Sequence, residues 1–382
     1  MSVTLDRIPT MVQGEGALAE IGPLAVALGG EGARVLLAAD PGLKPSGMVD
    51  EALAVLRKAG AAPILFDDIK SDPTTRQCDA GAALARAEKA SVVVALGGGS
   101  ALDIGKAIAA IAPAGAPSET YALCASPFPA GTLAKICVPT TAGTGSETTR
   151  VSILTDGAGN KVWFWGDEIK AERVVLDPSL TVGLPAHLTA ATGVDAWVHA
   201  VEAATNARHN PANDVYAHAA IRLVVRHLER CVSHPGDVAA RAGLQLAAAF
   251  AGVAIDNAGT AIGHTIGHAM ASLRPIHHGR AVGLAMLATL GWNVGEDDGS
   301  FAGVAEAMGE GADAARVPGA FERLLRGTGV KVSLAGEFDG VTPGQLHAQM
   351  LRPENASMLT ANRRRPDDDQ LRRFAETVLT QG

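Results

Sequence analysis

The chain has 382 residues, 47% of them hydrophobic and only 4% aromatic, with a formal net charge of -8. This length allows two domains with separate cores, and the negative charge argues against nucleic acid as a partner. No secretory signal pattern opens the sequence and no apolar run reaches the length of a membrane span, so we expect a soluble, cytoplasmic protein with no membrane partner. Four cysteines without pairing or C-x-x-C spacing favour reduced thiols: Cys78, Cys124, Cys137 and Cys231.

Short apolar runs alternate with helical patterns in the first half of the chain. We expect strands over residues 34–40, 61–66 and 91–96, and helices over 48–59 and 74–90. This alternation is typical of βαβ units around a mainly parallel sheet. Residues 1–184 are therefore predicted to form an α/β domain.

The ends of the expected strands carry residues suited to a nucleotide. Asp40 follows the first strand, where its carboxylate can accept hydrogen bonds from a ribose and would repel a 2′-phosphate, which favours NAD over NADP. Four small residues follow the third strand and precede a helix over 101–112: Gly97, Gly98, Gly99 and Ser100. Glycines and a helix N-terminus together admit a phosphate. Asp103 either forms a capping box with Ser100 or contacts the ligand.

A second loop, residues 138–149, concentrates hydroxyl groups and glycines between two strands. Thr140, Thr141 and Thr144 offer hydroxyl groups that can hydrogen-bond a phosphate or a ribose, while the glycines leave room for it. The alternative is a purely structural loop. Beyond this loop, Val151, Ile255 and Trp197 are candidates for lining a substrate pocket, and Arg150 is a candidate for meeting an acidic substrate.

The character of the chain changes after Pro185. Alanine-rich helical patterns cover residues 188–205, 212–234, 238–256 and 260–273, and convincing strands are absent. We therefore predict an all-α domain over residues 185–382. The run Arg363–Arg365 precedes a proline and three aspartates and is interpreted as a solvated helix start.

Histidines are enriched in this second half, where ten of the eleven lie between His187 and His278. Asp195 and His199 are four residues apart, as are His264 and His268, so each pair shares one helix face. With the step His277-His278, these pairs form a credible cage for one divalent metal such as iron, zinc, copper or nickel. An isolated pair would more often be a solvated face, but small apolar neighbours indicate that the second pair is buried. Four other histidines lie among polar residues and are expected at the surface: His209, His218, His227 and His234.

These motifs together resemble the iron-containing (group III) alcohol dehydrogenase family. The resemblance is carried by Gly97–Lys106, Pro139–Glu147, Asp177-Pro178, Gly193–His199 and His264-x3-His268-x9-His278-Gly279, in the family's order. It implies an N-terminal Rossmann-like α/β domain and an all-α C-terminal domain, an architecture shared with the 3-dehydroquinate synthase relatives.

The resemblance also implies roles for individual residues. The metal ligands fall on Asp195, His199, His264 and His278, and an additional active-site histidine falls on His268. Cofactor contacts fall on Asp40, Gly98, Gly99, Ser100, Thr140, Thr141, Thr149 and Lys161. Asp72 stands where the family often has Asn.

The implied activity is hydride transfer between a small alcohol or aldehyde and NAD, with the metal as Lewis acid and His268 relaying a proton. By resemblance the metal is Fe(II), with Zn(II) as a common substitute, and a homodimer would be unsurprising. Two alternatives share the fold: a dehydroquinate synthase-like lyase and a maleylacetate reductase-like enzyme. A third is a metallohydrolase or metal-binding protein without a redox role.

Overall fold

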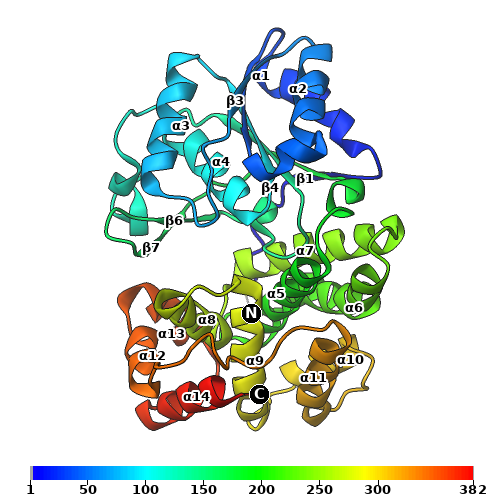
Figure 1. Ribbon diagram of the computed structural model, residues 1–382, viewed down its shortest axis with the longest axis vertical. Coiled ribbons are helices and arrows are strands. Elements are labelled where there is room, and N and C mark those ends of the chain that lie inside the picture. The colour runs from blue at the N-terminus through cyan, green and yellow to red at the C-terminus, as the bar shows by residue number, and fades with distance from the viewer. Residues whose placement is uncertain (1–2, 382) are drawn as a thin grey trace. The chain divides into compact units, whose positions relative to one another are not determined.

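A computed structural model describes residues 3–381 and divides them into two compact units (Figure 1). The unit that we call the sheet unit comprises Arg7–Thr141 and Gly145–Gly183. The helical unit comprises the described residues up to Asp6, the short segment Ala142–Thr144, and the chain from Leu184 onward. Each unit is described below by itself.

The sheet unit is built on six strands in the order β1-β8-β5-β4-β2-β3, and every neighbouring pair is parallel. The strands are β1 (Thr10–Gln13), β2 (Arg34–Ala39), β3 (Ala62–Phe66), β4 (Val92–Gly97), β5 (Ala134–Pro139) and β8 (Arg173–Leu176). The chain runs outward from β2 to β3 and then crosses to β4 on the other side of β2. The strand order therefore reverses between β2 and β4, and ligands of such sheets bind outside the carboxyl ends at this point.

Helices cover both faces of this sheet, as β2 shows. Leu36 and Ala38 belong to a core with α3 (Thr75–Ala87) and α4 (Gly99–Ile111). The alternate residues Val35, Leu37 and Ala39 belong to a second core with α1 (Ile21–Gly29) and α2 (Met48–Lys58). Because successive side chains point to opposite faces, a strand buried on both sides is apolar throughout. The predicted parallel α/β fold is confirmed.

Shorter elements complete the sheet unit. β6 (Val151–Thr155) and β7 (Lys161–Trp165) form an antiparallel pair in which alternate residues are buried. The 3-10 helices are η1 (Ala17–Glu20), η2 (Pro41–Ser46), η3 (Ser118–Thr120), η4 (Ala122–Cys124), η5 (Ser146–Thr148) and η6 (Pro178–Thr181). All four cysteines are free, as their spacing indicates.

The helical unit contains no strand among its described residues, so the predicted all-α character is confirmed. Its helices are α5 (Ala186–Thr205), α6 (Pro211–Ser233), α7 (Val238–Ala258), α8 (Ile262–Leu273), α9 (His278–Val294), α10 (Ser300–Ala307), α11 (Val317–Gly327), α12 (Pro343–Met350), α13 (Ala356–Ala361) and α14 (Asp368–Thr380), with η7 (Ala314–Arg316) and η8 (Pro353–Asn355). The helix α5 is buried from Thr189 to its end and packs against α6, α7 and α9. Residues on any face of α5 therefore lie inside the unit.

Trp197 of α5 corrects one expectation. Its side chain is fully buried, and its ring stacks on Phe321 of α11 with the centroids 4.2 Å apart. Trp197 is therefore a core residue of the helical unit and not part of a substrate pocket. Sequence alone gave no sign of this, because a tryptophan beside a candidate ligand suits either role.

The helix α7 corrects the expectation that no apolar run reaches the length of a membrane span. By length and composition alone, α7 is long and apolar enough to cross a membrane. However, 67% of its apolar stretch is buried, and α7 packs against α5 and α6. This environment is that of a core helix.

Surface assignments in the helical unit also need correction. Only His234 of the four expected surface histidines is exposed; His209, His218 and His227 are half-buried. The arginine run does not start a helix, since α14 begins at Asp368. Instead Arg363 pairs with Asp298 at 2.5 Å, and Arg364 pairs with Glu296 and lies 4.1 Å from the ring centroid of Trp292.

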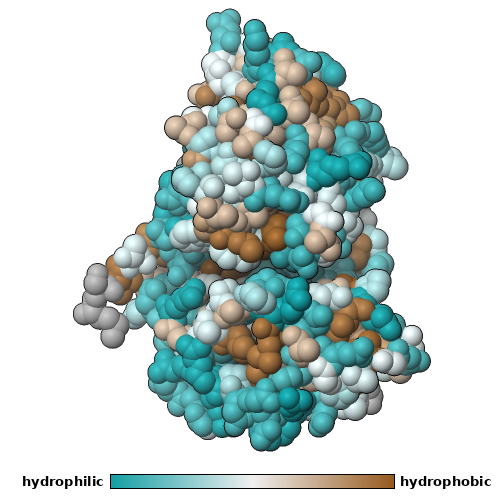
Figure 2. Space-filling model, turned by 90° about the vertical axis from the view of Figure 1, so that its left-hand side faces the viewer, coloured by the Kyte–Doolittle hydropathy of each residue, from teal (hydrophilic) through white to brown (hydrophobic). Residues whose placement is uncertain are grey.

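On the face drawn in Figure 2, several separate apolar patches lie among hydrophilic side chains. Among the described residues, the exposed large hydrophobic side chains are Val3, Leu5, Leu123, Trp165, Val215 and Leu351. Scattered residues of this kind are normal for a folded protein.

Candidate metal centre and nucleotide-binding loops

Four side chains from three helices of the helical unit converge on one point. Asp195 and His199 lie one turn apart on α5, His264 is in the first turn of α8, and His278 is the first residue of α9. One ligand atom from each lies within 4.8 Å of all the others. The Oδ1 atom of Asp195 is 3.7 Å from His199 Nε2, 3.8 Å from His264 Nε2 and 3.5 Å from His278 Nε2.

A glycine permits α9 to approach α5 this closely. A Cβ atom at Gly279 would lie 2.1 Å from the carbonyl oxygen of Ala191 and 3.1 Å from the Cβ atom of Asp195. Any side chain there would push the start of α9, and with it His278, away from Asp195. In the His278-Gly279 pair, a candidate ligand is thus followed by the residue that lets it reach the other three.

The polar atoms at this point fit a divalent metal. Asp195 Oδ1 and His264 Nε2 are buried and have no hydrogen-bond partner, which is costly for polar atoms in a protein interior. The separations of 3.5–3.8 Å between Asp195 Oδ1 and the three imidazole Nε2 atoms are compatible with bonds of about 2.0–2.2 Å from each atom to one ion. A cation at the centre would satisfy both atoms at once.

The charges of these groups also suit a metal. Burial disfavours the charged form of Asp195, yet the histidines around it hold the pKa of its carboxyl below the usual range. Burial, together with His199 and His278, lowers the pKa of His264 well below its ordinary value. An ionised carboxylate and a neutral imidazole are the forms that ligate metal.

His268 lies beside this cluster but is not one of the converging four. It is half-buried on α8, one turn after His264. Its ring centroid is 5.3 Å from that of His278 and 6.0 Å from that of His264. His268 can therefore act next to the cluster while remaining more accessible to solvent than His264.

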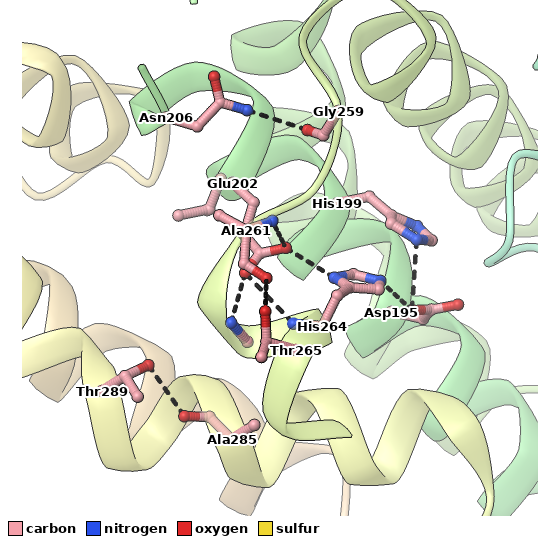
Figure 3. Close-up of polar contacts among 12 residues, drawn as sticks. Asp195, His199, Glu202, Asn206, Gly259, Ala261, His264, Thr265, Ala285 and Thr289 are labelled. Carbon is pink, nitrogen blue, oxygen red and sulfur yellow. Dashed lines mark hydrogen bonds and ion pairs between the residues drawn. The ribbon is translucent and has the colours of Figure 1, made fainter. Parts of the chain in front are cut away.

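One residue near the cluster, Glu202, was not predicted from the sequence. Glu202 on α5 is buried, and its Oε2 atom is 2.6 Å from Nδ1 of His264 (Figure 3). Burial raises the pKa of Glu202 to about 7, although backbone N–H groups of Ala261 and Gly263 oppose the shift. Its position held a signal, since Glu202 is seven residues after Asp195 and three after His199, on the same helix face.

In the sheet unit, the glycine loop (residues 97–100) and the start of the threonine loop (residues 138–149) meet beside Asp40. Gly97, with φ of 149°, ends β4, and a Cβ atom there would lie 3.0 Å from the Cβ atom of Asp40. The Thr140 N–H donates to the carbonyl of Gly97 at 2.9 Å, and a Cβ atom at Gly98 would lie 3.3 Å from Cγ2 of Thr141. These residues thus surround the carboxyl ends of β2, β4 and β5, at the reversal of strand order where nucleotides bind.

The capping of the N-terminus of α4 differs from the prediction. Gly98 is the N-cap residue and no side chain caps the helix, so the predicted Ser100–Asp103 capping box is wrong. The carboxylate of Asp103 instead accepts hydrogen bonds from Ser146 Oγ at 2.5 Å and from the Ile153 N–H at 2.9 Å. These bonds join α4 to η5 and β6. A role for Asp103 at the cofactor remains a prediction.

Lys106 links the same elements from the next turn of α4. It is fully buried, and its ammonium donates to the carbonyls of Ser146 at 2.7 Å and Val151 at 2.6 Å. The hydroxyl of Thr149 lies 3.3 Å from this ammonium. Lys106 therefore fixes the end of the threonine loop, and Thr149, a predicted cofactor contact, is tied into that arrangement.

The remaining predicted cofactor residues are more dispersed. The ammonium of Lys161 on β7 is 2.5 Å from the carboxylate of Asp72 and 3.2 Å from the hydroxyl of Thr155. Ser100 is half-buried in the first turn of α4, with Gly99 before it. Thr144 belongs to the helical unit.

Arg150, a candidate for meeting an acidic substrate, is buried. Its guanidinium lies 3.4 Å from the carboxylate of Asp167 and 5.0 Å from the ring centroid of Trp165.

The fold and the site define a class of enzyme that depends on a metal and a nucleotide. The parallel α/β unit has phosphate-admitting loops at its strand reversal, and the all-α unit has a cluster of three histidines and one carboxylate. Comparison with known families agrees with this class. The model of the iron-containing alcohol dehydrogenases matches residues 9–178, and the model of the C-terminal part of that family matches residues 189–372. The chain belongs to the iron-containing alcohol dehydrogenase family, as the motifs indicated.

Individual relatives support this assignment. The chain is 32% identical to the NAD-dependent methanol dehydrogenase of Bacillus methanolicus over 83% of each chain. It is 35% identical to the 1,3-propanediol dehydrogenase of Klebsiella pneumoniae over 78% of this chain and 77% of the relative. Among solved structures, the sulfoacetaldehyde reductase of Bifidobacterium kashiwanohense in complex with NAD+ superposes with a TM-score of 0.91 at 28% identity, covering 100% of this chain and 99% of that one.

Proposed function

We propose that this protein is an NAD-dependent dehydrogenase of small alcohols, and reductase of the corresponding aldehydes, with one divalent metal held by Asp195, His199, His264 and His278. The observation that carries the proposal is the convergence of four ligand atoms within 4.8 Å, two of them buried without a hydrogen-bond partner. The family membership supplies the reaction class.

A metal held by these four residues would supply Lewis-acid polarisation of the substrate oxygen, and a bound nicotinamide would supply or accept the hydride. The chain's own residues manage orientation and charge. Asp195 supplies a negative charge to the ligand set, while the three imidazoles are neutral ligands. His268, beside the cluster and half-buried, takes the proton of the alcohol in oxidation and returns it in reduction.

We propose Fe(II) as the metal, with Zn(II) able to replace it. Three imidazoles and one carboxylate suit both ions, and intrinsic affinity alone does not favour iron. Metal analysis of protein purified without added metal, followed by reconstitution with each ion, distinguishes them.

For the cofactor, we propose that Gly97, Gly98, Gly99 and Ser100 meet the pyrophosphate, together with Thr140 and Thr141. The N-terminus of α4, which no side chain caps, leaves backbone N–H groups for that purpose. Asp40 is proposed to accept hydrogen bonds from the adenosine ribose and so to favour NAD over NADP. Thr144, Thr149, Lys161 and Asp103 complete the proposed set.

The test is a screen of small alcohols and aldehydes, beginning with methanol and 1,3-propanediol, that follows NADH absorbance with Fe(II) and Zn(II) added separately. We expect net NADH formation that depends on the metal. A dehydroquinate synthase-like lyase would regenerate its cofactor and accumulate no NADH. A maleylacetate reductase-like enzyme would retain its activity after chelation. The absence of NAD(H) binding by calorimetry would instead favour a metal protein without redox function.

We also propose that the protein works in the cytoplasm as a homo-oligomer, a dimer in the simplest case. Its four free cysteines are compatible with a reducing compartment. Light scattering coupled to size-exclusion chromatography gives the oligomeric state, and cell fractionation gives the location.

A further inference from the structure

Glu202 occupies an unusual position beside the proposed metal centre. It is 2% exposed and lies one turn beyond His199 on the same face of α5. Its Oε2 atom lies 2.6 Å from Nδ1 of His264 and accepts from the Ala261 N–H at 2.8 Å, and its Oε1 atom accepts from the Gly263 N–H at 2.6 Å (Figure 3). The His264 N–H is within 3.4 Å of Oε1 as well. One buried carboxylate thus serves four donors from a single segment.

We propose that Glu202 is a positioning residue that fixes His264 as a metal ligand in two ways at once. This inference rests on the proposed function, since it concerns a ligand of the proposed metal.

The first way acts on the imidazole ring. Backbone N–H groups of Ala261 and Gly263 donate to the two oxygens of Glu202, so the carboxylate acts as an acceptor and the close contact places the proton of His264 on Nδ1. Nε2 then carries the lone pair, and it is one of the four ligand atoms that lie within 4.8 Å of one another, 3.8 Å from Asp195 Oδ1. Such a carboxylate–histidine pair holds the ring of a ligand in orientation and raises its basicity.

The second way acts on the helix that carries the ring. The first N–H groups of α8 have no intrahelical acceptor, and its N-cap residue Ala261 has no side chain that could accept. Glu202 supplies these acceptors from α5, and its charge complements the positive end of the α8 dipole. Because Asp195 and His199 are on α5 too, one side chain ties the helix with two proposed ligands to the helix with the third.

The contacts of Glu202 require a carboxylate at position 202 and a glycine at position 263. A glutamine at position 202 has one acceptor oxygen, and its NH2 group would face a backbone N–H or the imidazole N–H. A Cβ atom at Gly263 would lie 2.8 Å from Glu202 Oε1, so alanine there would displace the carboxylate while every proposed ligand remains.

The experiment compares metal binding by the full-length protein and by the variants Glu202→Gln, Glu202→Asp and Gly263→Ala. Dissociation constants for Co(II) and Zn(II) come from chelator competition, and the visible spectrum of the Co(II) form reports ligand geometry. We expect Glu202→Gln to weaken binding by about 10- to 100-fold and to change the Co(II) spectrum. Glu202→Asp, which keeps the charge, should recover part of the affinity, and Gly263→Ala should weaken binding in the same direction.

The control is Asp237→Ala, which removes the N-cap of α7, a carboxylate that accepts from the Ala240 N–H at 3.0 Å away from the proposed ligands. It should lower the free energy of unfolding without changing metal affinity or the Co(II) spectrum, whereas NADH affinity should stay unchanged in all variants. Wild-type affinity and spectrum in Glu202→Gln would overturn the inference. If that variant does not fold, wild-type binding by both Glu202→Asp and Gly263→Ala overturns it. A wild-type protein that binds no metal would overturn the proposed function instead.

Discussion

At the scale of single residues, two histidines one turn apart on α8 have different proposed roles: His264 as a metal ligand and His268 as a proton-transfer group. His264 is 3% exposed and has a buried Nε2 atom without a hydrogen-bond partner, whereas His268 is half-buried beside it. Two histidines of one helix thus lie in different environments, one buried and one half-buried. This contrast makes the pair suitable for a matched experiment.

We expect His264→Ala to remove the metal and abolish turnover, because one of four ligands is lost. His268→Ala should keep the metal content of the wild type and lower kcat by about 10²–10⁴-fold, the usual contribution of a positioned proton-transfer group. Metal analysis and steady-state kinetics on both variants provide the check. Loss of metal from His268→Ala would contradict its assignment as a proton relay.

The buried carboxyl of Glu147 should make the free energy of unfolding depend on pH. Burial raises the pKa of this carboxyl from 4.5 to about 7, and its Oε1 atom has no hydrogen-bond partner. Between these values the folded state binds the proton and the unfolded state does not, so the contribution of Glu147 is most favourable below pH 4.5 and is lost as the pH rises through 7.

Glu147→Gln should therefore remove a decline in stability on the order of 3 kcal/mol between pH 4.5 and 8. Denaturant unfolding of the wild type and the variant across this range provides the measurement. Parallel curves for the two proteins would show that Glu147 does not titrate in this interval.

The helix α5 organises the helical unit at the scale of elements. Its buried faces carry Asp195, His199 and Glu202 on one side and Trp197 on another. Packing of the helix and assembly of the proposed metal centre therefore depend on each other. A cavity beside Trp197 tests this dependence through stability.

Trp197→Ala should lower the free energy of unfolding by about 3–5 kcal/mol, because it removes a fully buried ring stacked on Phe321. Trp165→Ala is the matched control: Trp165 is 48% exposed, so its loss should cost about 1 kcal/mol or less. Urea unfolding compares the two. A similar cost for both tryptophans would contradict the core assignment of Trp197.

At the scale of the whole molecule, the two units are expected to respond to different ligands. A ligand that binds only the folded state stabilises it by about 4 kcal/mol at a thousand times its dissociation constant. Metal should stabilise the helical unit, in which all four proposed ligands lie, and NAD+ should stabilise the sheet unit with its glycine loop.

Chelation should thus lower the Tm of the protein, and added Fe(II) or Zn(II) should restore it, as measured by calorimetry. In the His264→Ala variant, chelator should have no effect, whereas NAD+ should still raise the Tm. A chelator effect that persists in the variant would place the relevant metal elsewhere.

The sequence by itself predicted part of the fold and most of the candidate residues. Three strands and three helices of the sheet unit were predicted near their observed bounds, since burial on one or two faces imposes a period of 2 or 3.6 on the chain, whereas β1, β7, β8 and α1 were not predicted. The pairs Asp195–His199 and His264–His268 followed from the same period. Family motifs then identified the chemistry, because glycine loops and histidine spacings are local patterns.

Only the tertiary structure decided which of these residues come together and what surrounds them. The convergence of α5, α8 and α9, the contact between Glu202 and His264, and the burial of Trp197 join segments far apart in the sequence. Composition could not distinguish α7, a core helix, from a membrane span. Local periodicity fixes which face of an element is apolar, but the neighbour that covers this face is chosen by packing between distant segments.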